Sequence, residues 1–188
     1  MARTPSVMVP LGFKAPEFEL LDVVSNSILK SKTLFGAKAT MIMFICNHCP
    51  FVKYVNKQIV EIANVYDKLG IKFIAISSND VENYPEDSPE RMKKVALEEK
   101  YPFPYLYDET QETTKAFGAS RTPHVFVLNK EGDKLKVEYV GAIDNNYRDA
   151  SLASKKYVEQ AVDNLLKGKQ VETKFTKTIG CGIKWKES

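Results

Sequence analysis

The stretch Met41-Ile-Met-Phe-Ile-Cys46-Asn47-His48-Cys49-Pro50 decides the fold and the chemistry of this chain. An apolar run of strand length leads into two cysteines in a C-x-x-C spacing, and the proline that follows is tolerated only in the first turn of a helix. We therefore expect a buried strand over 40–45 and a helix that begins near Cys49. Two thiols at this spacing close a small disulfide reversibly, and a helix N-terminus favours the thiolate. The junction predicts redox chemistry.

The composition is that of one folded domain, because 44% of the 188 residues are hydrophobic and 27% are charged. The formal net charge of +3 is small, which argues against a nucleic-acid partner or a membrane-surface role. The first residues carry no secretory signal, and no apolar stretch is long enough to span a bilayer. Three cysteines are too few for a secreted disulfide framework. We expect a soluble, cytoplasmic protein.

Hydrophobic periodicity predicts the remaining elements. After the first helix, which Gly70 ends, a second buried strand is expected, and strand, helix and strand with short links imply a parallel pair with a right-handed crossover. The predicted strands are 15–21, a short one within 22–38, 71–77, 105–107, and a hairpin of 125–129 and 134–142. The predicted helices are 49–69, 88–100, 110–117 and 152–167. This order predicts an α/β fold with a central mixed β-sheet and helices on both faces.

Two motifs together resemble the thioredoxin superfold. They are the C-x-x-C between the first core strand and its helix, and Arg121-Thr122-Pro123-His124 at the start of the hairpin. In that superfold a Thr-Pro pair at this place carries a cis-proline packed against the cysteines. Cys49-Pro50 is similar to the peroxiredoxin signature, and the segments 77–89 and 181–185 resemble peroxiredoxin-like redoxins of the AhpC/TSA type. The resemblance implies a thioredoxin-like fold and thiol chemistry.

The chain departs from both groups of proteins next to the cysteines. Peroxiredoxins keep Thr or Ser three residues before the peroxidatic cysteine and Pro seven before it, where this chain has Cys46 and Ile42. Thioredoxin has Trp before its first cysteine and a buried acid six residues before it, where this chain has Ile45 and Thr40. Neither the peroxiredoxin mechanism nor the thioredoxin mechanism can therefore be carried over unchanged to this chain.

The resemblance also implies a domain organisation. We expect a leader over 1–12, a thioredoxin-like redoxin domain over 13–168, and a basic tail over 169–188 that carries Cys181 and Trp185. A lysine-rich tail is usually a solvated face. Glycines on either side of Cys181 give it a flexible mount, so this third cysteine could resolve a mixed disulfide or a sulfenic acid. The alternative is a bystander cysteine.

The order in which the two motif cysteines react stays open in the sequence. For disulfide exchange, Cys46 would be the exposed nucleophile and Cys49 the resolving thiol, and for peroxide reduction the roles would reverse. Protonated His48 between them would stabilise a thiolate and make the disulfide more oxidising. The alternative for His48 is a solvent-exposed ring with no tuning role.

Four further residues are expected to shape the site. Pro50 starts the helix, and Thr122 with Pro123 would leave a backbone group ready to hydrogen-bond an incoming substrate, unless Pro123 is an ordinary trans proline. His124 is a general base, a polar wall, or a hydrogen-bonded strand residue.

The leading hypothesis is a thiol–disulfide oxidoreductase that cycles a Cys46–Cys49 disulfide, with thiol-dependent peroxidase activity as an extension. It needs no cofactor, acts on a protein or small-molecule disulfide or a peroxide, and requires a thiol reductant. The competing hypothesis is a copper or zinc module with Cys46, Cys49 and His124 as ligands. A third is an inactive scaffold that keeps the fold.

Overall fold

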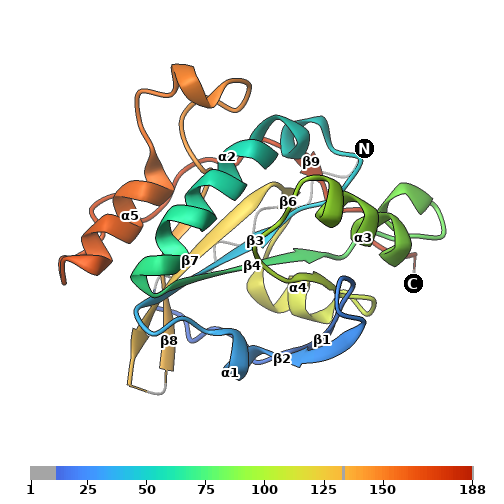
Figure 1. Ribbon diagram of the computed structural model, residues 1–188, viewed down its shortest axis with the longest axis horizontal. Coiled ribbons are helices and arrows are strands. Elements are labelled where there is room, and N and C mark those ends of the chain that lie inside the picture. The colour runs from blue at the N-terminus through green and yellow to red at the C-terminus, as the bar shows by residue number, and fades with distance from the viewer. Residues whose placement is uncertain (1–11, 133, 188) are drawn as a thin grey trace.

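The computed structural model describes residues 12–132 and 134–187, and its centre is a seven-stranded mixed sheet (Figure 1). The strand order is β2-β1-β5-β4-β3-β7-β8. The strands are β1 (Glu19–Asp22), β2 (Ser27–Lys30), β3 (Ala39–Phe44), β4 (Ile71–Ser77), β5 (Tyr105–Tyr107), β7 (His124–Glu131) and β8 (Lys134–Gly141). β3, β4 and β5 run parallel, whereas β7 and β8 form an antiparallel hairpin whose first strand pairs with β3.

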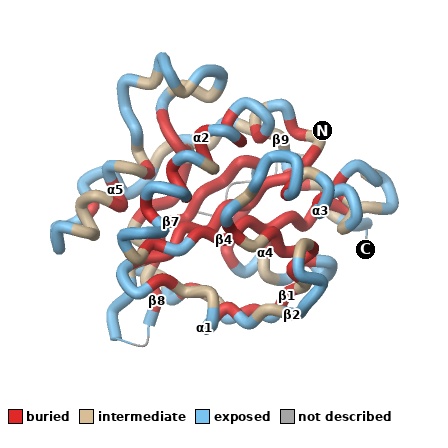
Figure 2. Tube along the Cα trace, viewed as in Figure 1, coloured by how far each residue is buried: buried red, intermediate tan, exposed pale blue. Residues whose placement is uncertain are grey.

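Helices cover both faces of this sheet. They are α1 (Ser31–Leu34), α2 (Pro50–Tyr66), α3 (Pro89–Glu98), α4 (Glu112–Phe117) and α5 (Tyr157–Leu166). Residues of α2, α3 and α5 pack in one apolar cluster, and Phe117 of α4 packs in the other. Figure 2 shows buried residues along the central strands and exposed ones on the outer sides of the helices. The predicted α/β architecture is confirmed.

The side chains of β3 alternate between the two apolar clusters, one on each face of the sheet. Met41 and Met43 belong to the cluster under α2, while Ile42 and Phe44 belong to the opposite one. Successive side chains of a strand point to opposite faces, so a strand that is covered on both sides must be apolar throughout. This is why a continuous apolar run, and not an alternating one, marks the central strand.

β3, β4, β5 and β8 are found within one residue of their expected ends, whereas β7, α3 and α4 each differ by two residues at one end. β4 and β5 have the predicted bounds. The first helix is α2 followed by a short 3-10 turn, Asp67–Leu69, and Gly70 closes it with a left-handed φ of 85°. Glycine adopts this conformation without the steric cost that a Cβ brings.

Two predicted elements begin at least four residues later than expected. The strand expected over 15–21 starts at Glu19. The last helix starts at Tyr157 and not at residue 152, because the side chain of Asp149 accepts a hydrogen bond from the backbone N–H of Ser151 and forms a separate 3-10 turn. Asp and Ser side chains compete with helical hydrogen bonds in this way.

The segment expected to be a solvated tail returns to the core. Val171 and Ile183 are buried in the two apolar clusters. A second sheet of two short strands joins β6 (Arg121–Thr122) to β9 (Cys181–Gly182). The expected leader, apart from residue 12, lies outside the described residues.

We predict that Phe117→Ala lowers the free energy of unfolding by about 3–5 kcal/mol. The Phe117 ring is fully buried and lies 5.6 Å from the ring of Phe44 and 5.5 Å from that of Phe126 (centroid distances), so its removal leaves a cavity under the sheet. Urea denaturation followed by circular dichroism measures the loss. Leu97→Ala is the control, because Leu97 is 59% exposed and the change should stay within about 0.5 kcal/mol. Equal losses in the two variants would contradict the packing described for α4.

Candidate active site

Both motif cysteines lie where β3 gives way to α2. Cys46 follows the strand after one residue, and Cys49 is the N-cap residue of the helix that Pro50 starts. Their side chains are 1% and 0% exposed, respectively. Neither thiol is exposed, so Cys46 is not the exposed nucleophile that the sequence led us to expect for disulfide exchange.

The sulfur of Cys49 is surrounded by hydrogen-bond donors. The pKa of Cys49 is lowered to about 4, first by a hydrogen bond from the Cys46 thiol, and then by the Cys181 thiol and the backbone N–H groups of Val52 and Cys181. Burial opposes these donors, and so does the carbonyl oxygen of Thr122, 3.2 Å from the sulfur, since it accepts a hydrogen bond only from the protonated thiol. The donors prevail, so the pKa of Cys49 lies below that of an ordinary thiol.

Cys46 has the opposite character. Its pKa is raised above the ordinary thiol value, first because its proton is shared with Cys49, and then by burial and by the negative charge of Asp87. Its sulfur lies 3.2 Å from the hydroxyl of Thr122. The pair therefore holds one proton, which stays on Cys46 and stabilises the charge on Cys49.

The cis-proline loop contacts both sulfurs. The Thr122–Pro123 bond is cis, as the resemblance implied. Thr122 reaches Cys46 through its hydroxyl and Cys49 through its carbonyl oxygen. The loop is thus one wall of the thiol site.

His124 is buried on the far side of this loop. Its ring packs against Phe126 with centroids 4.8 Å apart, and its Nδ1 atom has no hydrogen-bond partner among the described residues. Burial, with a smaller effect of the Arg121 charge, lowers the pKa of His124 to about 4. The ring is neutral at physiological pH, so it contributes an uncharged polar surface beside the cis-proline loop and not a positive charge.

A buried carboxylate that the sequence analysis did not single out organises the cysteine loop. Asp87 is fully buried and accepts hydrogen bonds from the backbone N–H groups of Asn47 at 2.7 Å and His48 at 3.3 Å. Its other oxygen lies 2.5 Å from Nδ1 of His48 and 2.7 Å from Nδ2 of Asn79. His48 also stacks on Tyr84. Nδ1 of His48 thus contacts this carboxylate, and His48 is not among the groups that lower the pKa of Cys49.

The third cysteine completes the thiol site. Cys181, on β9, places its sulfur 2.8 Å from that of Cys49, across 132 residues of sequence. Burial first, and then the neighbouring Cys49, raise the pKa of Cys181 to about 11. The three cysteines are free thiols in this structure.

The cluster of metal-binding side chains is not the one expected. Cys46, His48 and Asp87 have ligand atoms within 4.8 Å of one another, whereas no group found in the described part of the chain contains His124. The oxygens of Asp87 are already hydrogen-bonded to four donors. Metal binding at this cluster would break these bonds. The competing copper or zinc module with Cys46, Cys49 and His124 as ligands is not supported either, because His124 lies outside the cluster.

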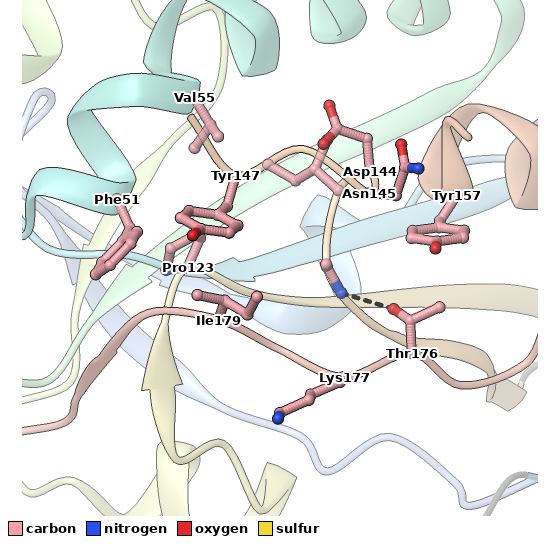
Figure 3. A pocket seen from close by; sticks show the side chains of 12 residues that line it. Phe51, Val55, Pro123, Asp144, Asn145, Tyr147, Tyr157, Thr176, Lys177 and Ile179 are labelled. Carbon is pink, nitrogen blue, oxygen red and sulfur yellow. Dashed lines mark hydrogen bonds between the residues drawn. The ribbon is translucent and has the colours of Figure 1, made fainter. Parts of the chain in front are cut away.

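A pocket of about 200 Å³ opens beside the cis-proline loop (Figure 3). Phe51, Tyr147 and Ile179 lie around Pro123, and more polar residues, including Thr176, line the other end. Pro123 follows the residue that contacts two of the sulfurs. The pocket therefore borders the thiol site and offers space for an apolar group.

None of the helices in the described part of the chain is long and apolar enough to span a bilayer.

A comparison with curated proteins finds no match. Among solved structures, the chain is similar to an uncharacterized conserved protein from Geobacillus kaustophilus, with 48% identity, a TM-score of 0.90, and coverage of 97% of this chain and 96% of the other. It is also similar to a hypothetical protein from Sinorhizobium meliloti, with 32% identity, a TM-score of 0.89, and coverage of 99% and 100%.

More distant structures share the fold. Peroxidoxin BcpB from Mycobacterium tuberculosis is 16% identical, with a TM-score of 0.61 and coverage of 84% of this chain and 96% of the other. The likeness identifies the fold as thioredoxin-like, as expected. The AhpC/TSA family model matches residues 11–138, which include β3, the cysteine loop, α2 and the cis-proline loop. The chain belongs to the AhpC/TSA family.

Proposed function

We propose that this protein is a thiol–disulfide oxidoreductase in which Cys49 is the attacking thiol and Cys46 is the thiol that resolves. The observation that carries the proposal is the place of the Cys49 sulfur, at the N-cap of α2 and 2.8 Å from the Cys181 sulfur. The pKa of Cys49 is lowered to about 4 and that of Cys46 is raised, so Cys49 is the thiolate of the pair. The thiolate is the nucleophile in disulfide exchange. The order of attack is then that of a peroxiredoxin-like site.

The reaction proceeds in two exchanges. The Cys49 thiolate attacks one sulfur of a substrate disulfide, and the other substrate sulfur leaves as a thiolate and takes a proton from solvent. Cys46 then loses its proton and attacks the sulfur of Cys49, which releases the second substrate thiol. The substrate gains two electrons, and the protein is left with a Cys46–Cys49 disulfide. An external thiol reductant restores the two thiols.

Peroxide reduction is an extension of the same chemistry. Attack of the Cys49 thiolate on a peroxide transfers one oxygen and leaves a sulfenic acid, while the rest of the peroxide departs as water or an alcohol. Cys46 condenses with the sulfenic acid and releases water. The position of Cys49 before Pro50 at a helix start supports this activity. It would make the protein an antioxidant enzyme.

The pocket beside Pro123 suggests how a substrate approaches. Its apolar end, formed by Phe51, Tyr147 and Ile179, would hold an apolar group next to the reacting sulfurs. We propose the cytoplasm as the place of action, because three cysteines are too few for the disulfide framework of a secreted protein.

Replacing the two motif cysteines should have unequal effects. Cys49→Ser should abolish reduction of a peptide disulfide with dithiothreitol as electron donor, because no other thiol of the site is a thiolate. Cys46→Ser should lower the turnover rate at least about tenfold, since it removes both the resolving thiol and the main donor to Cys49. Turnover above the uncatalysed rate is the measurement, with peroxide as the substrate in a parallel assay. Wild-type rates in the Cys49→Ser variant would refute the proposal.

The charge on Cys49 can be measured directly. Thiolate absorbance near 240 nm should titrate in the wild type with a midpoint near pH 4, because the lowered pKa keeps the thiolate above that pH. An ordinary cysteine would titrate near pH 8.5. The low-pH step should be absent from Cys49→Ser, which is the matched control. A single step near pH 8.5 in the wild type would show that the donors around Cys49 do not stabilise its charge.

A further inference from the structure

The short strand β9 is held tightly against the cis-proline loop. It pairs antiparallel with β6, so that Cys181 lies opposite Thr122 and Gly182 opposite Arg121. A Cβ atom at Gly180 would lie 2.2 Å from the carbonyl oxygen of Thr122. The guanidinium of Arg121 donates a hydrogen bond to the Gly180 carbonyl oxygen at 3.1 Å. Glycine at position 180 therefore permits the approach that brings Cys181 to Cys49.

The residues after β9 anchor the strand in place. The Ile183 side chain is buried, and its N–H donates to the Ser120 carbonyl oxygen. The Lys184 carbonyl oxygen accepts hydrogen bonds from Asp80 N–H and the Gln111 side chain. These bonds after the strand, together with the bond from Arg121 to Gly180 before it, fix β9 within the site.

The three thiols differ in their access to solvent. Cys46 and Cys49 are buried, whereas Cys181 is partly exposed. The Cys181 and Cys49 sulfurs lie 2.8 Å apart, and the bond of a disulfide is about 2.05 Å long. A small side-chain movement therefore brings the two sulfurs to bonding distance. Cys181 links the buried pair to the solvent.

We propose that Cys181 relays reducing equivalents from an external thiol to the buried Cys46–Cys49 pair, with β9 acting as a substrate strand built into the chain. This inference rests on the proposed function, because it concerns how the oxidised site is reduced. The β6 edge, which the sequence analysis expected to hydrogen-bond an incoming substrate, is occupied by the protein's own backbone. The reductant therefore needs only to reach Cys181, and a small thiol is sufficient.

The relay conserves atoms and electrons at each step. Cys181 loses its proton and attacks the Cys49 sulfur of the Cys46–Cys49 disulfide. The Cys49–Cys181 bond forms, the Cys46–Cys49 bond breaks, and Cys46 leaves with the electron pair and takes up a proton. A dithiol then attacks the Cys181 sulfur and releases the Cys49 thiolate. The second thiol of the reductant closes its own disulfide and releases Cys181, so two electrons have passed from the dithiol to the protein.

The central intermediate can be trapped. In Cys46→Ser the first resolving thiol is missing, so oxidation with the thiol oxidant diamide should form the Cys49–Cys181 disulfide. Alkylation of free thiols, followed by non-reducing peptide mapping, should recover the two cysteines in one linked pair. Recovery of both cysteines as alkylated thiols in the folded variant would overturn the relay.

The reduction step tests the role of Cys181 separately from that of the buried pair. Wild-type protein is oxidised with the peptide disulfide, freed of excess reagent, and mixed with dithiothreitol. Cys181→Ser should be reduced at least about tenfold more slowly than wild type. This loss should exceed any change in its oxidation by the peptide disulfide, which reports the loss of the Cys181 thiol as a donor to Cys49. Reduction of Cys181→Ser at the wild-type rate would overturn the relay and leave the proposed function standing. Failure of the wild type to be oxidised would instead refute the proposed function.

Two glycine variants provide a matched pair for the strand contact. Gly180→Ala should push β9 away from Thr122 and slow the reduction step in the same direction as Cys181→Ser. Gly182→Ala should leave the step within about twofold of wild type, because a Cβ at position 182 meets no heavy atom within 4 Å among the described residues. Equal rates in the two folded variants would contradict the role of β9.

Discussion

The stabilisation of one buried negative charge, on the sulfur of Cys49, is the constraint on which the rest of the site depends. A charge removed from water is costly unless hydrogen-bond donors surround it. The donors here come from three places in the chain: the Cys46 thiol before α2, the Val52 N–H in its first turn, and the thiol and N–H of Cys181 on β9. The loop, the helix and the tail must therefore all be in position before Cys49 becomes a thiolate. Docking of the tail is therefore part of forming the proposed nucleophile.

A second buried charge explains why the proton stays on Cys46. Asp87 binds the N–H groups of Asn47 and His48 and so fixes the loop between the cysteines. Its negative charge also raises the pKa of Cys46. The carboxylate thus acts on both members of the pair, since it holds the loop that positions them and keeps Cys46 as the donor. The interaction between His48 and Asp87 belongs to this framework.

The fold could be predicted from the sequence, and the site only in part. The apolar run of β3, the proline that starts α2 and Gly70 each have a local physical cause, so their positions were predicted closely. Asp87 lies 40 residues from Asn47. The segment 77–89 carries the family resemblance, but no local pattern in it distinguishes Asp87 from a surface acid. The two-residue strand β9 is too short to show periodicity. Contacts between such distant segments arise from tertiary packing, which local patterns do not encode.

Under the proposed function, the thiol that stands in place of the peroxiredoxin hydroxyl favours disulfide exchange over peroxide reduction. A threonine at position 46 could hydrogen-bond a peroxide but could not be oxidised by its neighbour. Cys46 donates a hydrogen bond to the Cys49 thiolate, as a hydroxyl would, and can also form a bond to it. The chain has therefore exchanged a group that orients peroxide for a second thiol, and the Thr122 hydroxyl nearby contacts the Cys46 sulfur. Cys46 and Cys181 both lie next to Cys49, so an oxidised Cys49 can form a disulfide with either of them. The proposed thiol–disulfide exchange requires such neighbouring thiols.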